Sequence, residues 1–315
     1  MEFQSKAVQM KENVSKVIVG KGNVTDLILT ALIAGGHVLL EDVPGTGKTM
    51  IAKSFAKSID AEFARIQFTP DLLPSDITGI NYYNQKQGEF VFRKGPVFSN
   101  ILLADEINRA TPRTQSALLE CMEEHQVTVD GETRKLGFPF IVIATQNPIG
   151  SIGTQKLPES QMDRFMVKLS MGYPSVEDEI TIMKSRSEND KRKILSECVL
   201  DNGDIQAIKE AVSDIYVDDS IYEYVANIVD KTRHRENIIQ GVSPRGSISI
   251  ISMAKAEAFL RGNEYVLPSD IKNIAVETLA HRLITNVAGA AGNEAAKKEI
   301  TDILRMVPVP KMQEK

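Results

Sequence analysis

The stretch Leu39-Leu-Glu-Asp-Val-Pro-Gly-Thr-Gly-Lys-Thr49 places a glycine-rich loop directly after an apolar run and directly before a helical pattern that begins at Met50. A polyphosphate needs several backbone N–H donors close by, and glycine allows the chain to curl tightly around such a group. Gly45 and Gly47 can provide that curl. Because the loop lies between a strand and a helix, as a phosphate-binding loop does, the stretch predicts a nucleotide site in an α/β fold.

The end of the loop carries the side chains that would contact the nucleotide. Lys48 should reach the terminal phosphates as a positive charge, and the Thr49 hydroxyl should be a ligand of Mg²⁺. Asp42 stands where the full motif has its first glycine, and we expect this to be tolerated because Asp accepts left-handed backbone better than most residues. The predicted nucleotide-binding residues of the loop are Pro44, Gly45, Thr46, Gly47, Lys48 and Thr49.

Further apolar runs alternate with helical patterns in the first half of the chain. Two of them, Ile101–Ala104 and Ile141–Ala144, show no polar alternation, which is typical of strands buried on both faces. We therefore predict an α/β fold: a three-layer αβα sandwich around a parallel five-stranded sheet, with these two strands at its centre. The expected strands are His37–Leu40, Phe63–Ile66, Ile101–Ala104, Ile141–Thr145 and Phe165–Leu169.

The run at Ile101–Ala104 delivers two carboxylates, Asp105 and Glu106, at its C-terminal end. Ligands of open α/β sheets bind at that edge. Because successive side chains on a strand point in opposite directions, the two carboxylates need not share one role. We expect Asp105 to hold hydrated Mg²⁺ and Glu106 to polarise the water that attacks ATP. An isolated Asp-Glu pair would more often belong to a solvated loop.

A third strand ends in Gln146-Asn-Pro148, which would place the Asn147 amide beside the same edge of the sheet. There we expect Asn147 to position the water or to sense the γ-phosphate. An Asn before Pro is by itself most often a turn residue. Its predicted role therefore depends on the other two motifs.

Two stretches interrupt the alternation of strands and helices. Residues 71–100 are rich in Pro, Gly, Asn and Gln and predict a hairpin within Ile80–Phe92 that turns near Gly88. Residues 124–140 predict a second hairpin, whose turn contains Asp130-Gly131, a strong hairpin signal. Both insertions should project from the sheet.

The second half of the chain differs in character. The pattern breaks at Gly172-Tyr-Pro-Ser175 and then reads almost wholly as helices. We place the domain boundary there, with a nucleotide-binding core at 1–172 and a smaller all-α domain at 173–315. The expected helices are Val176–Ser187, Ile205–Ser213, Ser220–His234, Arg245–Leu260 and Ile271–Leu283.

Composition narrows the classes of function. The 315 residues include two cysteines far apart and four histidines without metal-ligand spacing, which argues against disulfide frameworks and structural zinc. A net charge of −5 without a long basic block argues against nucleic acid as the partner. No apolar stretch reaches the roughly 20 residues that span a bilayer. Since no secretory signal is recognisable either, we expect a cytoplasmic location.

Taken together, these motifs resemble those of the AAA+ ATPases and, among them, the MoxR family. The resemblance covers nearly the whole chain. Five motifs in the family's order carry it, which makes it far more specific than a single loop. The motifs are Glu41–Thr49, Leu103–Ala110, Ala144–Pro148, Leu157–Phe165 and Gly241–Arg245.

The resemblance implies a homo-oligomer, a hexameric ring that binds ATP and Mg²⁺ between subunits. Arg164 matches the arginine finger that such families insert into the neighbour's site, where it stabilises charge on the γ-phosphate. The alternative for Arg164 is a surface ion pair with Asp163 or Glu159. Each ATP would thus be contacted by the loop, the carboxylates and Asn147 of one subunit and by Arg164 of the next.

Arg245 matches the second sensor of the lid domain in these families. Ser243 and Pro244 suit the N-cap and the first position of a helix, which places Arg245 in its first turn. A cation there is not favoured by the helix dipole, so it points to an anionic ligand. The alternative is a structural arginine.

Other features of the resemblance are less specific. Val17–Gly20 resembles the segment that packs against adenine, which would make Val19 and Gly20 binding residues, although an apolar helix end reads the same way. Arg109 belongs to the family pattern, and we suspect a subunit contact. The two hairpins resemble insertions that face the pore or a partner in relatives. The aromatic candidates of the first hairpin, which either contact a substrate or pack the hairpin, are Tyr82, Tyr83 and Phe90.

The resemblance implies a chaperone-like function, in which ATP hydrolysis in a ring drives remodelling or maturation of protein clients, among them proteins with a von Willebrand factor A domain. One alternative is an AAA+ motor acting on nucleic acid, which the acidic balance and the lack of a basic, aromatic-bearing face disfavour. Another is a nucleotide-gated assembly scaffold. The lack of an Asn-Lys-x-Asp segment argues against a GTPase.

Overall fold

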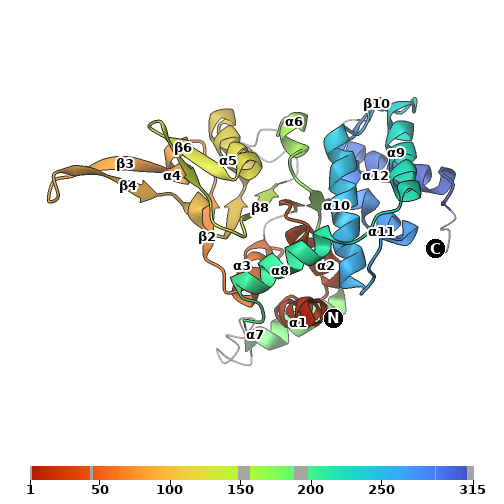
Figure 1. Ribbon diagram of the computed structural model, residues 1–315, viewed down its shortest axis with the longest axis horizontal. Coiled ribbons are helices and arrows are strands. Elements are labelled where there is room, and N and C mark those ends of the chain that lie inside the picture. The colour runs from red at the N-terminus through yellow and green to blue at the C-terminus, as the bar shows by residue number, and fades with distance from the viewer. Residues whose placement is uncertain (1, 43–44, 148–156, 188–197, 288, 311–315) are drawn as a thin grey trace.

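Five strands form a parallel sheet in the order β2-β5-β8-β1-β9 (Figure 1). The computed structural model describes residues 2–42, 45–147, 157–187, 198–287 and 289–310. Every pairing in this sheet is parallel, and the predicted strands are confirmed within one to two residues. The strands are β1 (Val38–Glu41), β2 (Phe63–Gln67), β5 (Ile101–Asp105), β8 (Ile141–Gln146) and β9 (Val167–Leu169).

The alternation of side chains along the strands builds a core on each face of the sheet. On β5, Ile101 and Leu103 pack into the larger core, whereas Leu102 and Ala104 pack into the smaller one. The three-layer sandwich is therefore confirmed. Helices α1 (Glu2–Val17), α2 (Gly22–Ile33) and α3 (Lys48–Ser58) cover the first face, and α4 (Pro74–Thr78) and α5 (Pro112–Glu124) cover the second.

Both stretches that predict hairpins form them. Strands β3 (Gly79–Asn84) and β4 (Glu89–Lys94) pair antiparallel, and this hairpin extends well away from the body of the molecule (Figure 1). Its base is tightly packed: a Cβ on Gly79 would lie 2.4 Å from the carbonyl oxygen of Arg93. The second hairpin consists of β6 (Gln126–Val129) and β7 (Glu132–Lys135), and both turn residues, Asp130 and Gly131, have positive φ.

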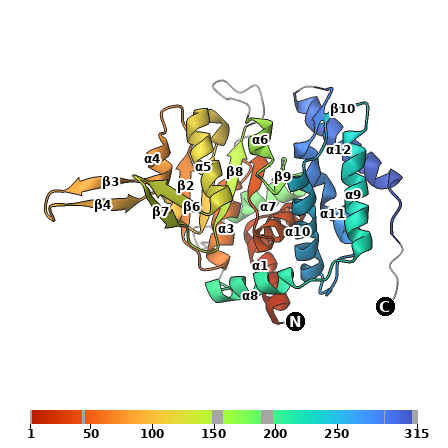
Figure 2. The ribbon, with the colours of Figure 1, turned by 45° about the horizontal axis from the view of Figure 1, so that its top comes forward.

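The segment after β9 is helical, as predicted, and lies beside the β9 edge of the sheet (Figure 2). It also contains a short antiparallel ribbon of β10 (Ile238–Gln240) and β11 (Ile284–Thr285), so it is not purely α-helical. Within the described residues, no helix is long and apolar enough to cross a membrane. The helices are α7 (Val176–Ser187), α8 (Asn202–Ser213), α9 (Asp219–Arg233), α10 (Pro244–Leu260), α11 (Pro268–Leu279) and α12 (Ala290–Met306).

Short elements complete the chain. The 3₁₀ helix η1 (Pro96–Phe98) precedes β5, η2 (Ile107–Arg109) follows it directly, and η3 (Ala280–Arg282) follows α11. Helix α6 (Glu159–Met162) leads into β9. Of these elements, η2 carries Arg109 and α6 lies just before Arg164, two arginines discussed below.

Candidate functional site

A cavity of about 580 Å³ opens at the C-terminal ends of the central strands. It brings together most residues that the sequence assigns to one nucleotide site, from the loop after β1, the end of β5 and the end of β8. Ligand sites of α/β sheets occur at this edge. The residues that line it are Gly45, Gly47, Lys48, Thr49, Met50, Lys53, Arg65, Gln67, Asp105, Glu106 and Asn147.

The loop wraps the start of α3 in the way that its glycines predict. Gly45 and Gly47 have φ of 88° and 95°, a region that disfavours other residues. Lys48 is the first residue of α3 and is nearly buried, and its Nζ donates to the carbonyl oxygen of Asp42 at 2.8 Å. Burial lowers the pKa of Lys48, and the carboxylates of Asp42, Asp105 and Glu106 oppose that shift. The predicted contact Pro44 lies outside the described residues.

Asp42 fits its position for a reason that differs from our expectation. The described non-glycine residues with positive φ are Asp60, Glu106, His125 and Asp130, so Asp42 is not left-handed and that argument was wrong. Its buried carboxylate instead accepts hydrogen bonds from the backbone amides of Met171 and Gly172, the latter at 3.1 Å. The side chain thereby ties the loop to the segment that follows β9.

The two carboxylates of the motif after β5 are held in different ways. Asp105 accepts a hydrogen bond from the Thr145 hydroxyl at 2.6 Å and forms an ion pair with Arg65 at 2.6 Å. The same Thr145 oxygen accepts the backbone N–H of Glu106 at 2.8 Å. Thr145, on the neighbouring strand β8, therefore fixes both residues relative to each other.

Glu106 occupies a left-handed conformation, with φ of 56°. Its Oε1 accepts from Asn147 Nδ2 at 2.8 Å, and its Oε2 accepts from Gln67 Nε2 at 2.7 Å and from Arg109 at 2.9 Å. Burial alone would raise the pKa of Glu106, but hydrogen bonds from Arg109 and Asn147 lower it overall. The group is thus a carboxylate at neutral pH, fixed in the cavity by three side chains.

Sequence reasoning missed Arg65 and Gln67, both on the edge strand β2. They lie two residues apart, so their side chains share one face of the strand, and both reach the carboxylates of β5. The available signal was the polar alternation in Phe63–Gln67, beside a strand that ends in two acids. Arg109, for which we suspected a subunit contact, bonds Glu106 within this chain.

The donor set of the cavity suits Mg²⁺. The Thr49 hydroxyl and the Asp105 carboxylate line the same space, and Mg²⁺ prefers oxygen ligands, of which substrate phosphates and water usually supply most. Among the described residues no group of three or more His, Cys, Asp or Glu side chains could hold a metal ion. The arrangement therefore fits an ion that arrives with a phosphate ligand better than a resident metal.

Arg164 and Arg245 do not line this cavity. Arg164 pairs with Glu123 at 2.9 Å and donates to the carbonyl oxygen of Leu119 at 2.8 Å, and Arg245 pairs with the other oxygen of Glu123. The adjacent Met122 carbonyl contacts His37, directly before β1. The two arginines therefore lie at the opposite edge of the sheet from the cavity, and Arg245 does not reach the nucleotide site of its own chain.

The structure also bears on the alternatives to a catalytic role for Arg164 and Arg245, which are a local ion pair and a structural arginine. Asp163 pairs with Arg282 rather than with Arg164. Ser243 caps α10 by accepting the N–H of Gly246 at 3.4 Å, with Pro244 at the first position, as the sequence predicts. Arg245 therefore stands in the first turn of a helix and is 42% exposed.

Val19 and Gly20 do not line the cavity. Helix α1 ends at Val17, and a Cβ on Gly20 would lie 2.0 Å from the Asp178 carboxylate of α7. The segment thus fits the alternative of a helix end packed against α7. A role at the adenine stays a prediction.

The aromatic residues of the β3–β4 hairpin are only partly packed. The rings of Tyr83 and Phe90 contact edge to face with centroids 5.4 Å apart. Phe90 nevertheless remains 74% exposed, and Tyr82 is 43% exposed. Packing within the hairpin therefore leaves most of this aromatic surface in water.

Comparison with known families agrees with the geometry. The model of the ATPase family associated with various cellular activities (AAA) matches residues 37–167. The model of the AAA lid domain matches residues 230–303. The first match spans the sheet up to the start of β9 and includes the cavity, and the second spans α10, which carries Arg245, α11 and most of α12.

Individual relatives resemble almost the whole chain. An uncharacterised Bacillus subtilis protein, YeaC, is 49% identical over 95% of this chain and 93% of its own length. The Mycobacterium tuberculosis protein named chaperone MoxR1 is 39% identical over 95% of this chain and 81% of its own length. The crystal structure of a candidate ATPase from Cytophaga hutchinsonii superposes with a TM-score of 0.90 at 40% identity, covering 98% of this chain and 96% of that one.

Proposed function

The chain belongs to the MoxR family of AAA+ ATPases, and from this premise we propose that it hydrolyses Mg·ATP at sites shared between adjacent copies of a ring. The work of that hydrolysis is the remodelling or maturation of partner proteins. AAA+ ATPases in general hydrolyse ATP. The shared site, the ring and the client are the parts that belong to our proposal.

One observation supports the proposal: the cavity with its lysine and carboxylates lies at one edge of the sheet, whereas the two candidate arginines lie at the opposite edge. Among the described residues, the cavity gathers Lys48, Asp105 and Glu106, and the arginine in its lining, Arg65, is paired with Asp105 and so is not placed to act as a finger. Arg164 and Arg245 lie together at the other edge. A head-to-tail contact between copies would bring the cavity and the arginines together, and such contacts close into rings.

The residues of the cavity would act on ATP as follows. Lys48 and the N-terminus of α3 bind the phosphates, because both present positive charge to them. The Glu106 carboxylate would accept a proton from the water that attacks the γ-phosphorus while the bond between that phosphorus and the bridging oxygen breaks and the oxygen leaves with ADP. Asn147, already bonded to Glu106 at 2.8 Å, would orient that water. Of the three bonds that hold Glu106, Oε1 accepts the one from Asn147, which leaves a lone pair on that oxygen for the water.

Mg²⁺ would be held by Thr49 and Asp105, and when bound it neutralises charge on the phosphate oxygens. The neighbour's Arg164 would stabilise the charge that spreads over the γ-phosphate, a contribution worth about 10³ to 10⁵ in rate for arginine fingers. Because Glu123 holds Arg164 and Arg245 together, we propose that both act on the same neighbouring nucleotide.

The client follows from the family rather than from the site. We propose that the ring is a hexamer and that its clients are proteins, among them proteins with a von Willebrand factor A domain. We propose further that the chain divides into a nucleotide-binding core at 1–172 and a lid at 173–315. The net charge of −5 supports a protein client over nucleic acid.

Mixing two inactive variants tests the shared site. Glu106→Gln removes the water-activating carboxylate, and Arg164→Ala removes the finger, so each variant alone should lose hydrolysis while still binding ATP. In a 1:1 mixture about a quarter of the sites would pair an intact Glu106 with an intact Arg164, by random pairing in a head-to-tail ring. Turnover should reappear on mixing. Full turnover by Arg164→Ala alone would refute the shared site.

A pull-down tests the client. Glu106→Gln loaded with Mg·ATP should retain client proteins, whereas Lys48→Ala, which cannot bind ATP well, should release them. Mass spectrometry of the two eluates would identify the difference. Recovery of nucleic acid with no enriched protein would replace the remodelling proposal with the alternative of a nucleic-acid motor.

A further inference from the structure

Helix α7 presents an apolar stripe to water. Val176, Ile180 and Met183 follow the spacing of one helical face, and they are 70%, 42% and 58% exposed. Tyr173, just before the helix, is 77% exposed. Contiguous exposed apolar side chains of this kind mark an interaction surface more often than a free one. We call these four residues the α7 stripe.

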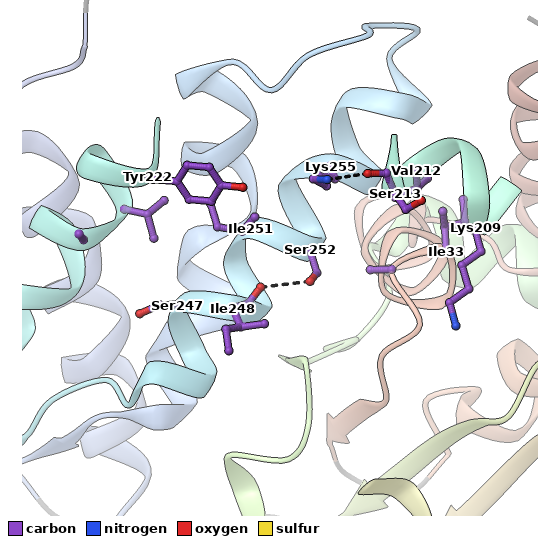
Figure 3. A pocket seen from close by; sticks show the side chains of 13 residues that line it. Ile33, Lys209, Val212, Ser213, Tyr222, Ser247, Ile248, Ile251, Ser252 and Lys255 are labelled. Carbon is purple, nitrogen blue, oxygen red and sulfur yellow. Dashed lines mark hydrogen bonds between the residues drawn. The ribbon is translucent and has the colours of Figure 1, made fainter. Parts of the chain in front are cut away.

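A complementary groove lies between α2, α8, α9 and α10. It encloses about 590 Å³, and Figure 3 shows Tyr222 and Ile251 on one side and Val212, Ile33 and Lys209 on the other. Ile248, on its rim, is 69% exposed. The lining is mainly apolar, with lysines at its margin. We call this cavity the α10 groove.

Each surface adjoins one half of the proposed shared site. We call the cavity with Lys48, Asp105 and Glu106 the nucleotide half-site, and the pair Arg164 and Arg245 the arginine half-site. On α10, Arg245, Ile248, Ser252 and Lys255 lie three to four residues apart and therefore on one face. The arginine half-site thus continues directly into the α10 groove. The surfaces also lie on different sides of the molecule: in Figures 1 and 2, α8 and α10 face the viewer and α7 lies behind.

The α7 stripe in turn begins beside the nucleotide half-site. Gly172, whose amide donates to Asp42 of the phosphate loop at 3.1 Å, directly precedes Tyr173. Lys21 donates to the carbonyl oxygen of Tyr173 at 2.9 Å. A contact that joins the two half-sites would therefore also bring the stripe and the groove of adjacent copies to the same interface.

Charge is complementary between the surfaces as well. The first turn of α7 carries Glu177, Asp178 and Glu179, whereas the margin of the groove carries Lys209 and Lys255. Complementary charge favours encounter in one orientation and fixes register. Two different, mutually complementary patches are what a head-to-tail contact requires, whereas a two-fold dimer would use the same patch twice.

We infer that the α7 stripe of one copy of this chain docks into the α10 groove of the next, forming the contact that assembles the shared ATP site. This rests on the proposed function and adds the surface that produces it. The occupant of the groove is thus a second copy of the chain. Helix α7 supplies the inserted side chains, and α10 supplies both the groove and Arg245.

Two single substitutions test the contact, one on each surface. Met183→Asp and Ile248→Asp place a charge at largely exposed positions, so both proteins should fold with unchanged thermal unfolding. Sedimentation velocity with the analogue AMP-PNP and Mg²⁺ should show the oligomer for the wild type and its loss for each variant. Val309→Asp, at an exposed position on neither surface, should assemble like the wild type. Oligomers that persist in both charged variants overturn the inference.

A mixture of the two variants gives a sharper result. Met183→Asp keeps an intact groove with Arg164, and Ile248→Asp keeps an intact stripe with its ATP cavity, so one of each should form a dimer with one working site. ATPase activity should rise at least severalfold over either variant alone. Adding Glu106→Gln to the Ile248→Asp chain should abolish that gain. No gain on mixing would contradict the docking.

The outcomes separate this inference from the proposed function. A wild type that hydrolyses ATP while both charged variants assemble normally overturns the docking surface and leaves the ATPase in place. A wild type without ATPase activity at any concentration removes the proposed function instead. If the stripe binds a client or a small molecule fills the groove, assembly will survive both substitutions, which also overturns the inference.

Discussion

The nucleotide half-site and the arginine half-site are built in contrasting ways. In the first, Glu106 is held by three side chains from β2, η2 and the end of β8, and Thr145 fixes it relative to Asp105. In the second, Arg164 and Arg245 converge on one exposed carboxylate, Glu123. The first is fixed by hydrogen bonds between packed strands, whereas the second is a pair of cations that share one exposed carboxylate.

The difference in how the two sets of side chains are held corresponds to the difference in their proposed roles. Groups that must be positioned before substrate arrives are fixed by packed strands and hydrogen bonds. In our proposal Arg164 and Arg245 leave Glu123 to enter a neighbouring copy, which is feasible because a surface ion pair contributes at most about 1 kcal/mol and can be exchanged. Binding should therefore depend on the first half-site and turnover on both.

The largest expected effect is on ATP affinity, and it distinguishes the nucleotide half-site from the arginine half-site. Lys48→Ala removes the proposed charge-assisted contact to the phosphates and should weaken ATP binding by roughly 10². Arg164→Ala should leave the affinity of the isolated chain within about twofold, because the proposed finger acts on a neighbour. Isothermal titration of dilute protein measures both. An equal loss of affinity in the two variants would mean that Arg164 reaches its own cavity.

Acid should weaken the arginine side of the molecule. His37, under Met122, has a pKa lowered to about 4 by burial, opposed by its hydrogen bond to Met122. The pKa of His37 is lower in the folded than in the unfolded chain. The contribution of His37 to the free energy of unfolding is therefore full above about pH 6.5 and is lost as pH falls toward 4. Between pH 6.5 and 5 the loss is about 2 kcal/mol from His37 alone.

His281 donates to the carbonyl oxygen of Phe165, beside Arg164. Burial holds the pKa of His281 well below its usual range, so it is lowered like the pKa of His37. Urea unfolding at pH 7, 6 and 5 measures the combined slope. His37→Gln should be less stable at pH 7 but should show a shallower dependence on pH. The same slope in this variant as in the wild type would contradict the assignment to His37.

Arg109→Ala probes the nucleotide half-site. Arg109 lowers the pKa of Glu106, so its removal should raise that pKa and move the acid limb of the pH–rate profile to higher pH. The loss of one charge-assisted hydrogen bond should also reduce turnover by about tenfold. Arg113→Ala, an exposed arginine on α5, is the matched control. A profile that falls in rate without moving in pH would give Arg109 a purely structural role.

The smallest effect concerns Glu123. Glu123→Gln should change the free energy of unfolding by less than about 1 kcal/mol, as for other exposed pairs. It should raise ATPase activity at low protein concentration by roughly two- to fivefold, because the arginines no longer have a competing carboxylate. Initial rates across a protein dilution series, with Glu124→Gln as control, test this. A decrease in rate would show that Glu123 positions the arginines for their function.

Much of the fold follows from the sequence because buried parallel strands have a strong local signature. The runs at Ile101–Ala104 and Ile141–Ala144 predict adjacent central strands, and they pair in register. The loop after β1 and the acids after β5 meet because parallel strands end at the same edge. The hairpin turn at Asp130-Gly131 forms for an equally local reason, since both residues need positive φ.

The remainder depended on contacts between segments far apart in the chain. Asp42 is explained by amides some 130 positions later, which no local pattern announces. Glu123 is an ordinary exposed acid of α5 until the fold brings Arg164 and Arg245 to it. Helix α12, which begins in a glycine- and alanine-rich stretch, also escaped prediction because its start lacks a capping side chain.

The β3–β4 hairpin has a mechanical consequence. Its base cannot yield easily, because a Cβ on Gly95 would lie 2.2 Å from the carbonyl oxygen of Ile77 in α4, and Gly79 is equally confined. Six-residue strands at ~3.3 Å per residue extend ~20 Å, so a rotation of ~5° at α4 displaces the tip by ~2 Å. The hairpin is thus a lever arm, and the exposed rings of Tyr83 and Phe90 lie along the part that travels farthest.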